Sequence, residues 1–387
     1  MQGKVLFCAT VDYHFRSFHL PVMEWFKEQG WDVHVAAKGE LALPFVDRKF
    51  NVPFERSPLR LANLKAYRQL RSIMRENAYD LVHCHTPMGG VIARLAARRF
   101  RNKGTTVIYT AHGFHFCKGA PLSHWLIYYP VEKTLARWTD CLITINDEDH
   151  RLAVRRRFKA GRIAHVHGVG VDMERFRPLS SSEKALHRRA YGYRRDDFLL
   201  FYAAEFNANK NHRLLIEAMA RIQAHVPNMR LLLAGRGDLQ EECRSLALAL
   251  GVERMIDFLG YRDDIDRLLP MCDVAVSGSL REGLPVNILE AMACGLPVVA
   301  VRNRGLAELV ADGSNGYLIE PGDAERFASR MAELANSESL RQAMGMRSRE
   351  RVGTYALPRV MSELSELYAG YMESRGSEAD DWRWTAP

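Results

Sequence analysis

The sequence lacks several features that would assign it to particular classes of protein. No stretch approaches the ~18 uninterrupted apolar residues of a membrane-spanning helix, so no transmembrane segment is expected. The seven cysteines are scattered without a Cys-x-x-Cys pair, which argues against a disulfide or zinc framework and favours reduced thiols in a cytosolic protein. The first residues run into an apolar strand pattern and lack the three-part layout of a signal peptide. Low-complexity tracts are absent, and the composition is that of a globular protein.

The charge of the chain is unevenly distributed. With 387 residues, the chain is too long for one ordinary core and suits two α/β domains. Residues 1–180 hold 28 basic and 16 acidic side chains, a net charge of +12, whereas the remainder holds 26 basic and 30 acidic ones, a net charge of −4. A basic first half favours an anionic partner such as a membrane surface, a lipid diphosphate or nucleic acid. Solvated helix faces would give the same charge, and charge alone leaves these alternatives open.

Apolar strand patterns alternate with helical patterns along the chain. The first series of expected strands lies at residues 4–10, 32–37, 80–85, 106–111, 140–146 and 163–167. The second series lies at residues 198–203, 230–234, 255–259, 274–277, 298–301 and 317–319. Because these strands are apolar on both faces, the pattern predicts an α/β fold with two doubly wound parallel sheets. We expect domains at 1–178 and 179–356, with ligands at the carboxyl ends of the strands in the crevice between them.

Residues 279–297 contain the most informative pattern in the sequence. An apolar strand pattern precedes this stretch, Gly283 and Pro285 mark a turn, and a short apolar helix and another strand follow. The turn is expected to present the backbone N–H groups of Gly283, Leu284 and Val286 at the N-terminus of the helix. Such a helix end suits a phosphate or diphosphate group.

The same stretch carries two carboxylates, Glu282 in the turn and Glu290 two turns into the helix. A carboxylate accepts hydrogen bonds from two hydroxyl groups, which fits a ribose or hexose diol. Taken singly, each of these features favours a plain turn with solvated charges. Together, the two glutamates separated by seven residues, the Gly-x-Pro turn and the Ala-Met-Ala-x-Gly-x-Pro ending resemble the donor-binding signature of retaining glycosyltransferases of family four.

The resemblance extends over nearly the whole chain and implies the GT-B fold, in which two Rossmann-like domains face a central cleft. It implies that Glu290 binds the ribose of the donor and that Glu282 contacts the transferred sugar as a catalytic residue. It also implies that a final helix at 357–372 crosses back onto the first domain. Residues 373–387 are charged and are expected to form a mobile tail.

The loop at residues 205–211 is expected to bind the donor diphosphate. Lys210 supplies a point charge, with Asn207 and Glu205 beside it. The family usually has an arginine where this chain has Glu205, so half of the expected cationic clamp is missing. Glu205 is instead a possible acceptor for Lys210 or for a donor hydroxyl group.

Two further loops are assigned to the donor by resemblance. Gly235 and Arg236 follow one expected strand, where the family has a glycine pair beside the nucleotide. Tyr261 and Arg262 follow the next strand, where the family backbone contacts the base. A solvated Arg236 and a packing role for Tyr261 are the alternatives.

The first domain carries one catalytic candidate and four acceptor-side candidates. His112 directly follows a strand, as the donor-proximal histidine of the family does, and a structural histidine is an equally common alternative. His115 and Lys118 share its loop, and His14 and Arg16 lie on the exit loop of the first strand. The family often has a Gly-Gly pair at that exit loop, which this chain lacks.

No constellation of metal ligands appears in the sequence, and no metal or cofactor is expected; Lys210 and helix N–H groups would stabilise the leaving diphosphate. The segment 112–133 further resembles capsule and exopolysaccharide glycosyltransferases. This implies a UDP-sugar donor, a hexosyl or N-acetylhexosaminyl transfer, a polyprenyl-diphosphate-linked acceptor, and a place at the inner face of the cell membrane. A sugar-nucleotide epimerase on the same architecture is the alternative. A nucleic-acid-binding module would not need Glu282 and Glu290, and we expect no nucleic-acid partner.

Overall fold

The structure, a computed structural model, describes residues 3–381, with side chains up to residue 373. The chain divides into unit 1, which comprises Met1–Gly170 and Pro358–Pro387, and unit 2, which comprises Val171–Leu357. The division comes earlier than the boundary expected at 178. The reason is that the backbone of Val171 bonds to both Tyr355 and Leu357, at 2.9 Å each, which ties the segment after Gly170 to unit 2.

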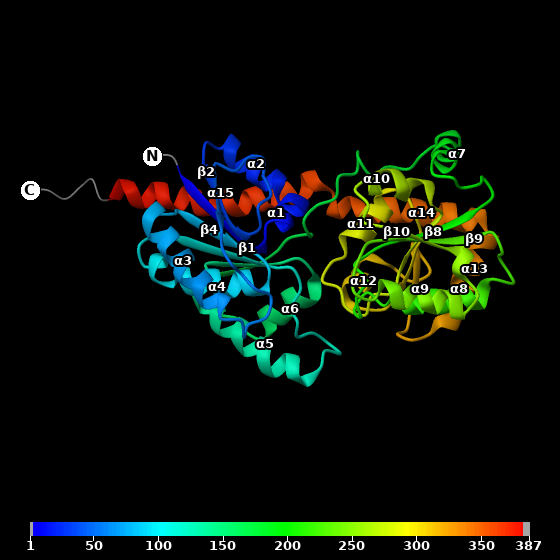
Figure 1. Cartoon of the computed structure of the whole chain (residues 1–387). Helices are drawn as coiled ribbons and strands as arrows, with labels where there is room; N and C mark the ends of the chain where they lie inside the picture. Colours follow the sequence, from blue (N-terminus) through cyan, green and yellow to red (C-terminus); the bar gives the residue numbers. More distant parts are fainter. Residues whose placement is uncertain (1–2, 382–387) are drawn as a thin grey trace, which may run out of the picture. The chain divides into compact units, whose positions relative to one another are not determined.

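Unit 1 contains a parallel sheet of seven strands in the order β3-β2-β1-β4-β5-β6-β7 (Figure 1). Its strands are β1 (Lys4–Val11), β2 (Asp32–Lys38), β3 (Arg48–Asn51), β4 (Leu81–Cys84), β5 (Thr106–Ala111), β6 (Cys141–Thr144) and β7 (Arg162–His165). Its α-helices are α1 (Tyr13–Phe18), α2 (Leu20–Glu28), α3 (Ala62–Asn77), α4 (Pro87–Arg101), α5 (Leu122–Leu135), α6 (Asp147–Arg155) and α15 (Leu357–Asp381). The strand order reverses between β1 and β4, which is the doubly wound arrangement predicted from the sequence.

The sheet of unit 1 is buried on both faces because successive side chains of a strand point to opposite sides. In β1, Leu6 and Cys8 belong to the hydrophobic cluster that also contains residues of α3 and α4. Val5 and Phe7 belong to the opposite cluster, with residues of α2 and α15. Tyr368 of α15 is 1% exposed there. The last helix is therefore part of the unit 1 core.

Unit 2 contains a parallel sheet of six strands in the order β10-β9-β8-β11-β12-β13. Its strands are β8 (Phe198–Ala203), β9 (Met229–Ala234), β10 (Ile256–Gly260), β11 (Val274–Ser277), β12 (Val298–Val301) and β13 (Gly316–Ile319). Its α-helices are α7 (Ser181–Ala190), α8 (His212–Ile222), α9 (Gln240–Ala249), α10 (Ile265–Leu268), α11 (Val286–Ala293), α12 (Arg304–Leu309), α13 (Ala324–Asn336) and α14 (Glu338–Val352). The order reverses between β8 and β11. Short 3-10 helices lie at Ala136–Trp138, Glu253–Met255, Leu269–Met271 and Gly353–Tyr355.

Two segments differ from the sequence expectation. The edge strand β3 was not expected, because its sequence has charged Arg48 and Lys49 and only one apolar residue, Phe50. Helix α15 continues to Asp381, so the first part of the segment expected to be a mobile tail is helical; residues 382–387 lie outside the described residues.

Candidate functional site

The turn between β11 and α11 holds a group of the predicted donor residues. Pro285 is the N-cap of α11, and Val286 is the first helical residue. The first hydrogen bonds of α11 run from the N–H groups of Ile288 and Leu289 to the carbonyl oxygen of Pro285. The N–H group of Val286 therefore has no acceptor within the helix. Gly283 and Leu284 lie in the turn just before it, with Leu284 buried. The N-terminus of α11 therefore offers backbone donors without a partner inside the helix, together with a positive dipole end, and these suit an anion.

Lys210 and Glu282 meet at the point where the strand order of unit 2 reverses. Lys210 follows β8 and Glu282 follows β11, and their Nζ and Oε1 atoms are 2.5 Å apart. Both side chains are mostly shielded, with 23% and 13% of their surface exposed. The carboxyl ends of strands at such a reversal are the usual ligand site of an open α/β sheet.

Backbone contacts fix the two loops against each other. Leu280 N donates to Asn209 O at 2.8 Å, and Asn209 Nδ2 donates to the carbonyl of Arg281 at 3.0 Å. Gly278 is required here, since a Cβ atom at this position would lie 2.5 Å from the carbonyl oxygen of Asn211. The Lys210–Glu282 pair thus rests on a rigid support.

Asn207 and Glu205 have a local role in this arrangement. Asn207 Oδ1 accepts a hydrogen bond from the backbone N–H of Lys210 at 3.0 Å, and its Nδ2 donates to Glu205 Oε2 at 3.2 Å. Lys210 pairs with Glu282, so the suggested Lys210–Glu205 pair does not form. Glu205 is exposed.

The loops after β9 and β10 carry the other predicted donor residues of unit 2. Gly235 has a φ of +148°, and a Cβ atom there would lie 1.9 Å from the carbonyl oxygen of Ala204, so only glycine fits. Arg236 is exposed. Tyr261 is 71% exposed and so has no packing role, whereas Arg262 is held in an ion pair by Asp264.

Glu290 lies deeper in α11, where burial raises the pKa of its carboxyl group to about 7. Arg175 opposes this shift in the pKa and Asp266 adds to it, while Arg175 and Asp266 also pair with each other at 3.1 Å. A hydroxyl-bearing ligand would find here a carboxyl group that titrates near neutral pH.

Arg304 is a residue near this site that the sequence reasoning missed. Its Nε donates to the carbonyl of Glu282 at 3.1 Å. The signal that would have found it is its position, since it opens α12 directly after β12, the strand next to β11.

Four histidines meet at the corresponding reversal of the unit 1 sheet. His14 and His19 follow β1, His85 follows β4 and His112 follows β5. His85 Nδ1 and His112 Nε2 are 3.2 Å apart, and the Nε2 atoms of His14 and His19 are 3.1 Å apart. The sequence reasoning selected His14 and His112 separately and missed His19 and His85.

The other three predicted residues of unit 1 do not join this cluster. His115 is exposed and its ring lies 4.7 Å from that of Tyr128 in α5. Lys118 is exposed and its backbone N–H donates to Glu148 at 2.9 Å. Arg16 is an exposed residue of α1.

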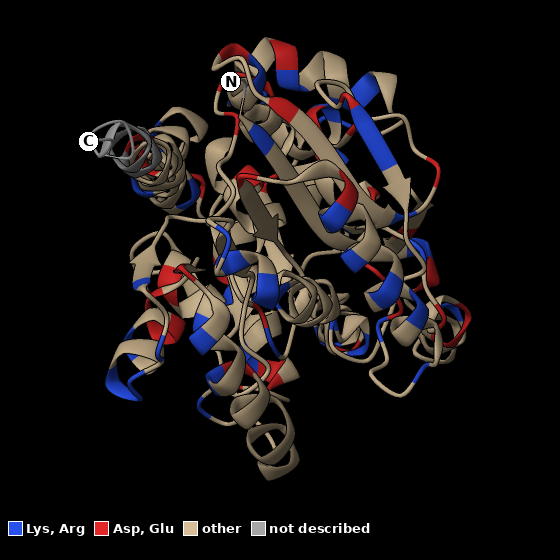
Figure 2. Ribbon diagram, turned by 90° about the vertical axis from the view of Figure 1, so that its left-hand side faces the viewer, with Lys and Arg blue, Asp and Glu red and all other residues tan. Residues whose placement is uncertain are grey.

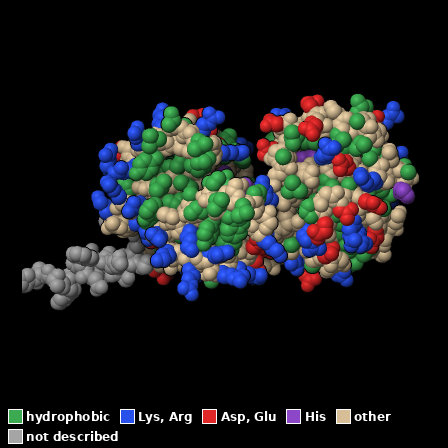
Figure 3. All heavy atoms as spheres, turned by 90° about the horizontal axis from the view of Figure 1, so that it is seen from below, with side chains coloured by type: hydrophobic (Ala, Val, Ile, Leu, Met, Phe, Trp, Pro, Cys, Tyr) green, Lys and Arg blue, Asp and Glu red, His purple; other side chains and the backbone are tan. Residues whose placement is uncertain are grey.

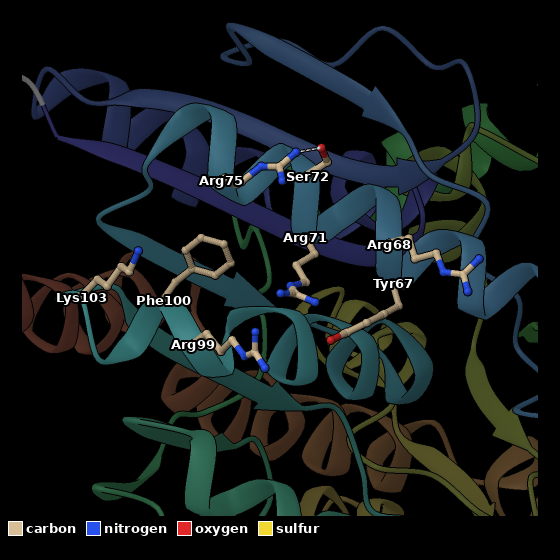
Figure 4. Close-up of a pocket in the computed structure, with 8 residues that line it drawn as sticks. All are labelled: Tyr67, Arg68, Arg71, Ser72, Arg75, Arg99, Phe100 and Lys103. Atoms are coloured by element: carbon tan, nitrogen blue, oxygen red, sulfur yellow. Dashed lines mark hydrogen bonds between the residues drawn. The ribbon is translucent and has the colours of Figure 1, made fainter.

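Unit 1 also has a basic pocket between α3 and α4 (Figure 4). The pocket has a volume of about 450 Å³, and its lining residues are Tyr67, Arg68, Arg71, Ser72, Arg75, Arg99, Phe100 and Lys103. Figure 4 shows Arg71 and Tyr67 extending from α3 toward Arg99 of α4, while Arg75 turns to Ser72 and donates to its Oγ at 3.2 Å. Five cations and no acid among the lining residues make this pocket suitable for an anion.

Helix α5 of the same unit exposes a row of aliphatic side chains. Leu122 is 75% exposed, Leu126 73%, Ile127 56% and Val131 40%. Figure 3 shows hydrophobic side chains gathered on the face of unit 1 where α5 lies, with Lys and Arg around them. Figure 2, which looks onto unit 1, shows Lys and Arg on its helices and on an edge of its sheet. No described helix is long and apolar enough to cross a membrane.

Comparison with known proteins places the chain in a family. A model described as "Glycosyl transferases group 1" matches residues 183–351, and one described as "Glycosyl transferase 4-like domain" matches residues 20–168. EpsD of Bacillus subtilis (strain 168), named as a glycosyltransferase, is 49% identical over 373 residues, covering 96% of this chain and 98% of EpsD. The chain belongs to the group 1 glycosyltransferases. It is therefore an enzyme that transfers sugars.

More distant relatives agree with this assignment. The chain is 28% identical over 313 residues to the UDP-Gal:alpha-D-GlcNAc-diphosphoundecaprenol alpha-1,3-galactosyltransferase of Escherichia coli, covering 80% of each protein. The structure of Anabaena Alr3699/HepE in complex with UDP and glucose matches with a TM-score of 0.78 and 19% identity, covering 95% of this chain and 100% of that one. The predicted GT-B class, with its two Rossmann-like domains, is confirmed. EpsD and the E. coli protein are both named for glycosyl transfer, so the epimerase alternative gains no support.

Proposed function

We propose that this glycosyltransferase moves a sugar from a UDP-sugar to a polyprenyl-diphosphate-linked glycan, with retention of the anomeric configuration, in cell-surface polysaccharide synthesis. The observation that carries the proposal is the Lys210–Glu282 pair beside the N-terminus of α11, at the strand reversal of unit 2. The names of the relatives support it: the E. coli enzyme is named for UDP-Gal and a diphosphoundecaprenol acceptor, HepE was crystallised with UDP and glucose, and CapM of Staphylococcus aureus is named for capsular polysaccharide biosynthesis.

In this proposal the diphosphate binds at the turn before α11. The N–H groups of Gly283, Leu284 and Val286 donate to its oxygens, and Lys210 supplies the positive charge that stabilises it as a leaving group. No divalent ion is needed for this step, because the cation and the helix end take over its electrostatic task. The backbone near Tyr261 contacts the base.

The two glutamates have different tasks. Glu290 accepts hydrogen bonds from the ribose hydroxyl groups, which are the same before and during the reaction. Glu282, held by Lys210, lies in the turn and contacts the transferred sugar, where charge develops as the glycosidic bond breaks. His112 stays a predicted catalytic residue, and His14, Arg16, His115 and Lys118 stay predicted acceptor-side residues, on the strength of the resemblance alone.

A lipid-linked acceptor requires a place at a membrane, and unit 1 has the chemistry for it. The aliphatic row of α5 suits the acyl boundary of a bilayer, and the cations of the α3–α4 pocket suit anionic head groups. We propose that the enzyme binds the inner face of the cell membrane through the aliphatic row of α5 and the basic pocket between α3 and α4.

The donor is tested by a thermal-shift panel of UDP, GDP and ADP together with their glucose and N-acetylglucosamine derivatives. A ligand present at 100 times its Kd adds about 2.7 kcal/mol of apparent stability, so the true donor should raise Tm and the wrong nucleotides should not. Equal shifts with all three nucleotides, or a shift with GDP alone, would refute the UDP assignment. The retained configuration is read from the anomeric proton signal of the product by NMR.

A further inference from the structure

The histidine cluster of unit 1 brings together four side chains from three loops. One ligand nitrogen each of His14, His19, His85 and His112 lies within 4.8 Å of the other three. These loops follow β1, β4 and β5, which are consecutive neighbours in the sheet, so the cluster sits at the strand reversal of the unit. The side-chain hydrogen bonds between these rings join imidazole to imidazole, as the His14–His19 and His85–His112 contacts show.

The ring nitrogens of the cluster do not all find hydrogen-bond partners within it. His14 and His19 share one contact between their Nε2 atoms, and His85 and His112 share another, so in each pair one nitrogen donates and the other accepts. The Nε2 atom of His85 is buried without a hydrogen-bond partner, and the residue is 0% exposed. Such an atom in a polar cluster indicates a missing partner.

The neighbouring His83 differs from the cluster because both of its ring nitrogens have hydrogen-bond partners. Its Nε2 contacts Thr110 Oγ1 and its Nδ1 contacts the hydroxyl of Tyr368, both at 2.8 Å. Its ring lies 4.1 Å from that of His85 and supports it. Both nitrogens of His83 are engaged, and it is not a member of the ligand set.

We propose that His14, His19, His85 and His112 bind one divalent transition-metal ion of the Zn²⁺ class. Imidazole nitrogen suits zinc and related ions, whereas Mg²⁺ and Ca²⁺ require oxygen ligands, which this set does not offer. Four nitrogen ligands complete a tetrahedral sphere and leave no open position, which is typical of a structural site. The ion would tie together the loops after β1, β4 and β5. This inference is independent of the proposed donor site, and it gives His14 and His112 a metal-binding role in place of the acceptor-side and catalytic roles that the resemblance implies.

The test uses the full chain, purified with a tag that contains no histidine and freed of metal by dialysis. Zn²⁺ is titrated by calorimetry at pH 7.5, with Mg²⁺ as the comparison, and bound metal is counted by elemental mass spectrometry. Co²⁺ replaces Zn²⁺ for visible spectroscopy, since tetrahedral Co²⁺ absorbs strongly. The variants are His19→Gln and His85→Gln, and the matched control is His225→Gln, because His225 is an exposed histidine of unit 2.

We expect one Zn²⁺ per chain, a tetrahedral Co²⁺ spectrum, a higher Tm with Zn²⁺ and no effect of Mg²⁺. Each cluster variant should lose more than ~10-fold in affinity, the effect of disturbing even an outer-shell partner of a metal site. The control should bind as the wild type does. The wild-type titration decides the matter even if a variant does not fold: absence of Zn²⁺ binding overturns the proposal. Binding that both cluster variants retain, or that His225→Gln equally abolishes, also overturns it.

Discussion

Lys210 Nζ and Glu282 Oε1 form a 2.5 Å ion pair that joins the loop after β8 to the turn after β11. The two residues are 72 positions apart in the chain and adjacent only because β8 and β11 are neighbours in the sheet. The pair holds a cation beside the N-terminus of α11 before any ligand arrives. We expect this arrangement to determine how the enzyme responds to substitutions and to divalent ions.

Replacing Lys210 by alanine should weaken donor binding. Loss of a hydrogen bond to a charged group typically costs about 1.5–3 kcal/mol, or roughly 10- to 150-fold in Kd, and the family arginine that would provide a reserve is Glu205 in this chain. Calorimetric titration with the UDP-sugar measures the change. Arg221→Ala is the matched control, since Arg221 is an exposed cation of α8. Wild-type affinity in Lys210→Ala would show that the diphosphate binds elsewhere.

Transfer should proceed without added divalent ions. Lys210 and the N–H groups before α11 supply the positive potential that a bound ion supplies in metal-dependent transferases. Omitting Mg²⁺ and Mn²⁺ from the assay should leave kcat within about twofold. A rate that falls to background without them, and returns on their addition, contradicts this. Zn²⁺ is kept constant in both arms because the histidine cluster is proposed to bind it apart from the donor diphosphate.

The stability of the protein should depend on pH through Glu290. Its pKa is about 7 in the folded chain and near 4.5 when unfolded, because burial disfavours the charge. Between these values the folded state holds the proton and the unfolded state does not, so the free energy of unfolding falls as pH rises from 4.5 to 7. The cost is on the order of 1–3 kcal/mol. Glu290→Gln should therefore exceed the wild type in stability at pH 8 and match it at pH 4.5, as measured by chemical denaturation.

The same carboxyl group should make donor binding depend on pH. An ionised Glu290 accepts hydrogen bonds from both ribose hydroxyls more strongly than a neutral one, so the affinity for a UDP-sugar should rise from pH 6 to pH 8. A UDP-sugar is the correct probe, since the terminal phosphate of UDP itself titrates near pH 6. Glu290→Gln should flatten the profile. A profile that keeps its slope in the variant assigns the titration to another group.

Membrane binding should need both the aliphatic row of α5 and the basic pocket between α3 and α4. Leu126→Ser with Ile127→Ser removes aliphatic side chains from α5, and Arg71→Glu with Arg99→Glu reverses charges in the pocket. Both double variants should sediment less with anionic vesicles than the wild type does, and the wild-type signal should decline with salt. Leu248→Ser is the control, because Leu248 is 67% exposed but belongs to unit 2. Equal binding to neutral vesicles contradicts the electrostatic contribution.

The sequence predicted the two sheets because their strands are apolar runs between helical patterns. It missed β3, where an edge position tolerates Arg48 and Lys49. It also predicted the region of the donor loops but not their pairs, since nothing local shows that Lys210 pairs with Glu282 or that Asp264 holds Arg262.

The histidine cluster is a second case in which the sequence does not show which distant residues lie together. Each of His14, His85 and His112 looks like a lone histidine after a strand. Their convergence depends on β1, β4 and β5 being neighbours, an order fixed by the packing of helices on the sheet. A search for histidines just after the expected strands would have found His14, His85 and His112 but not His19, which lies between α1 and α2.

Glu282 and Glu290 should fail differently when each is replaced by glutamine. Glu290 is assigned to the ribose, whose contacts do not change during the reaction, so its loss should raise the donor KM and weaken the binding of bare UDP. Glu282 is assigned to the transferred sugar, so Glu282→Gln should lower kcat and leave UDP binding within about threefold.

The ion pair with Lys210 complicates the second variant, because removing Glu282 also frees the cation. A freed Lys210 attracts the diphosphate more strongly, so UDP affinity in Glu282→Gln should stay level or rise while kcat falls. The double variant Lys210→Ala, Glu282→Gln separates the two effects. If Glu282 acts only by positioning Lys210, the double variant should be no slower than Lys210→Ala alone. If Glu282 contacts the sugar, the double variant should lose a further factor in kcat, and UDP binding should match that of Lys210→Ala.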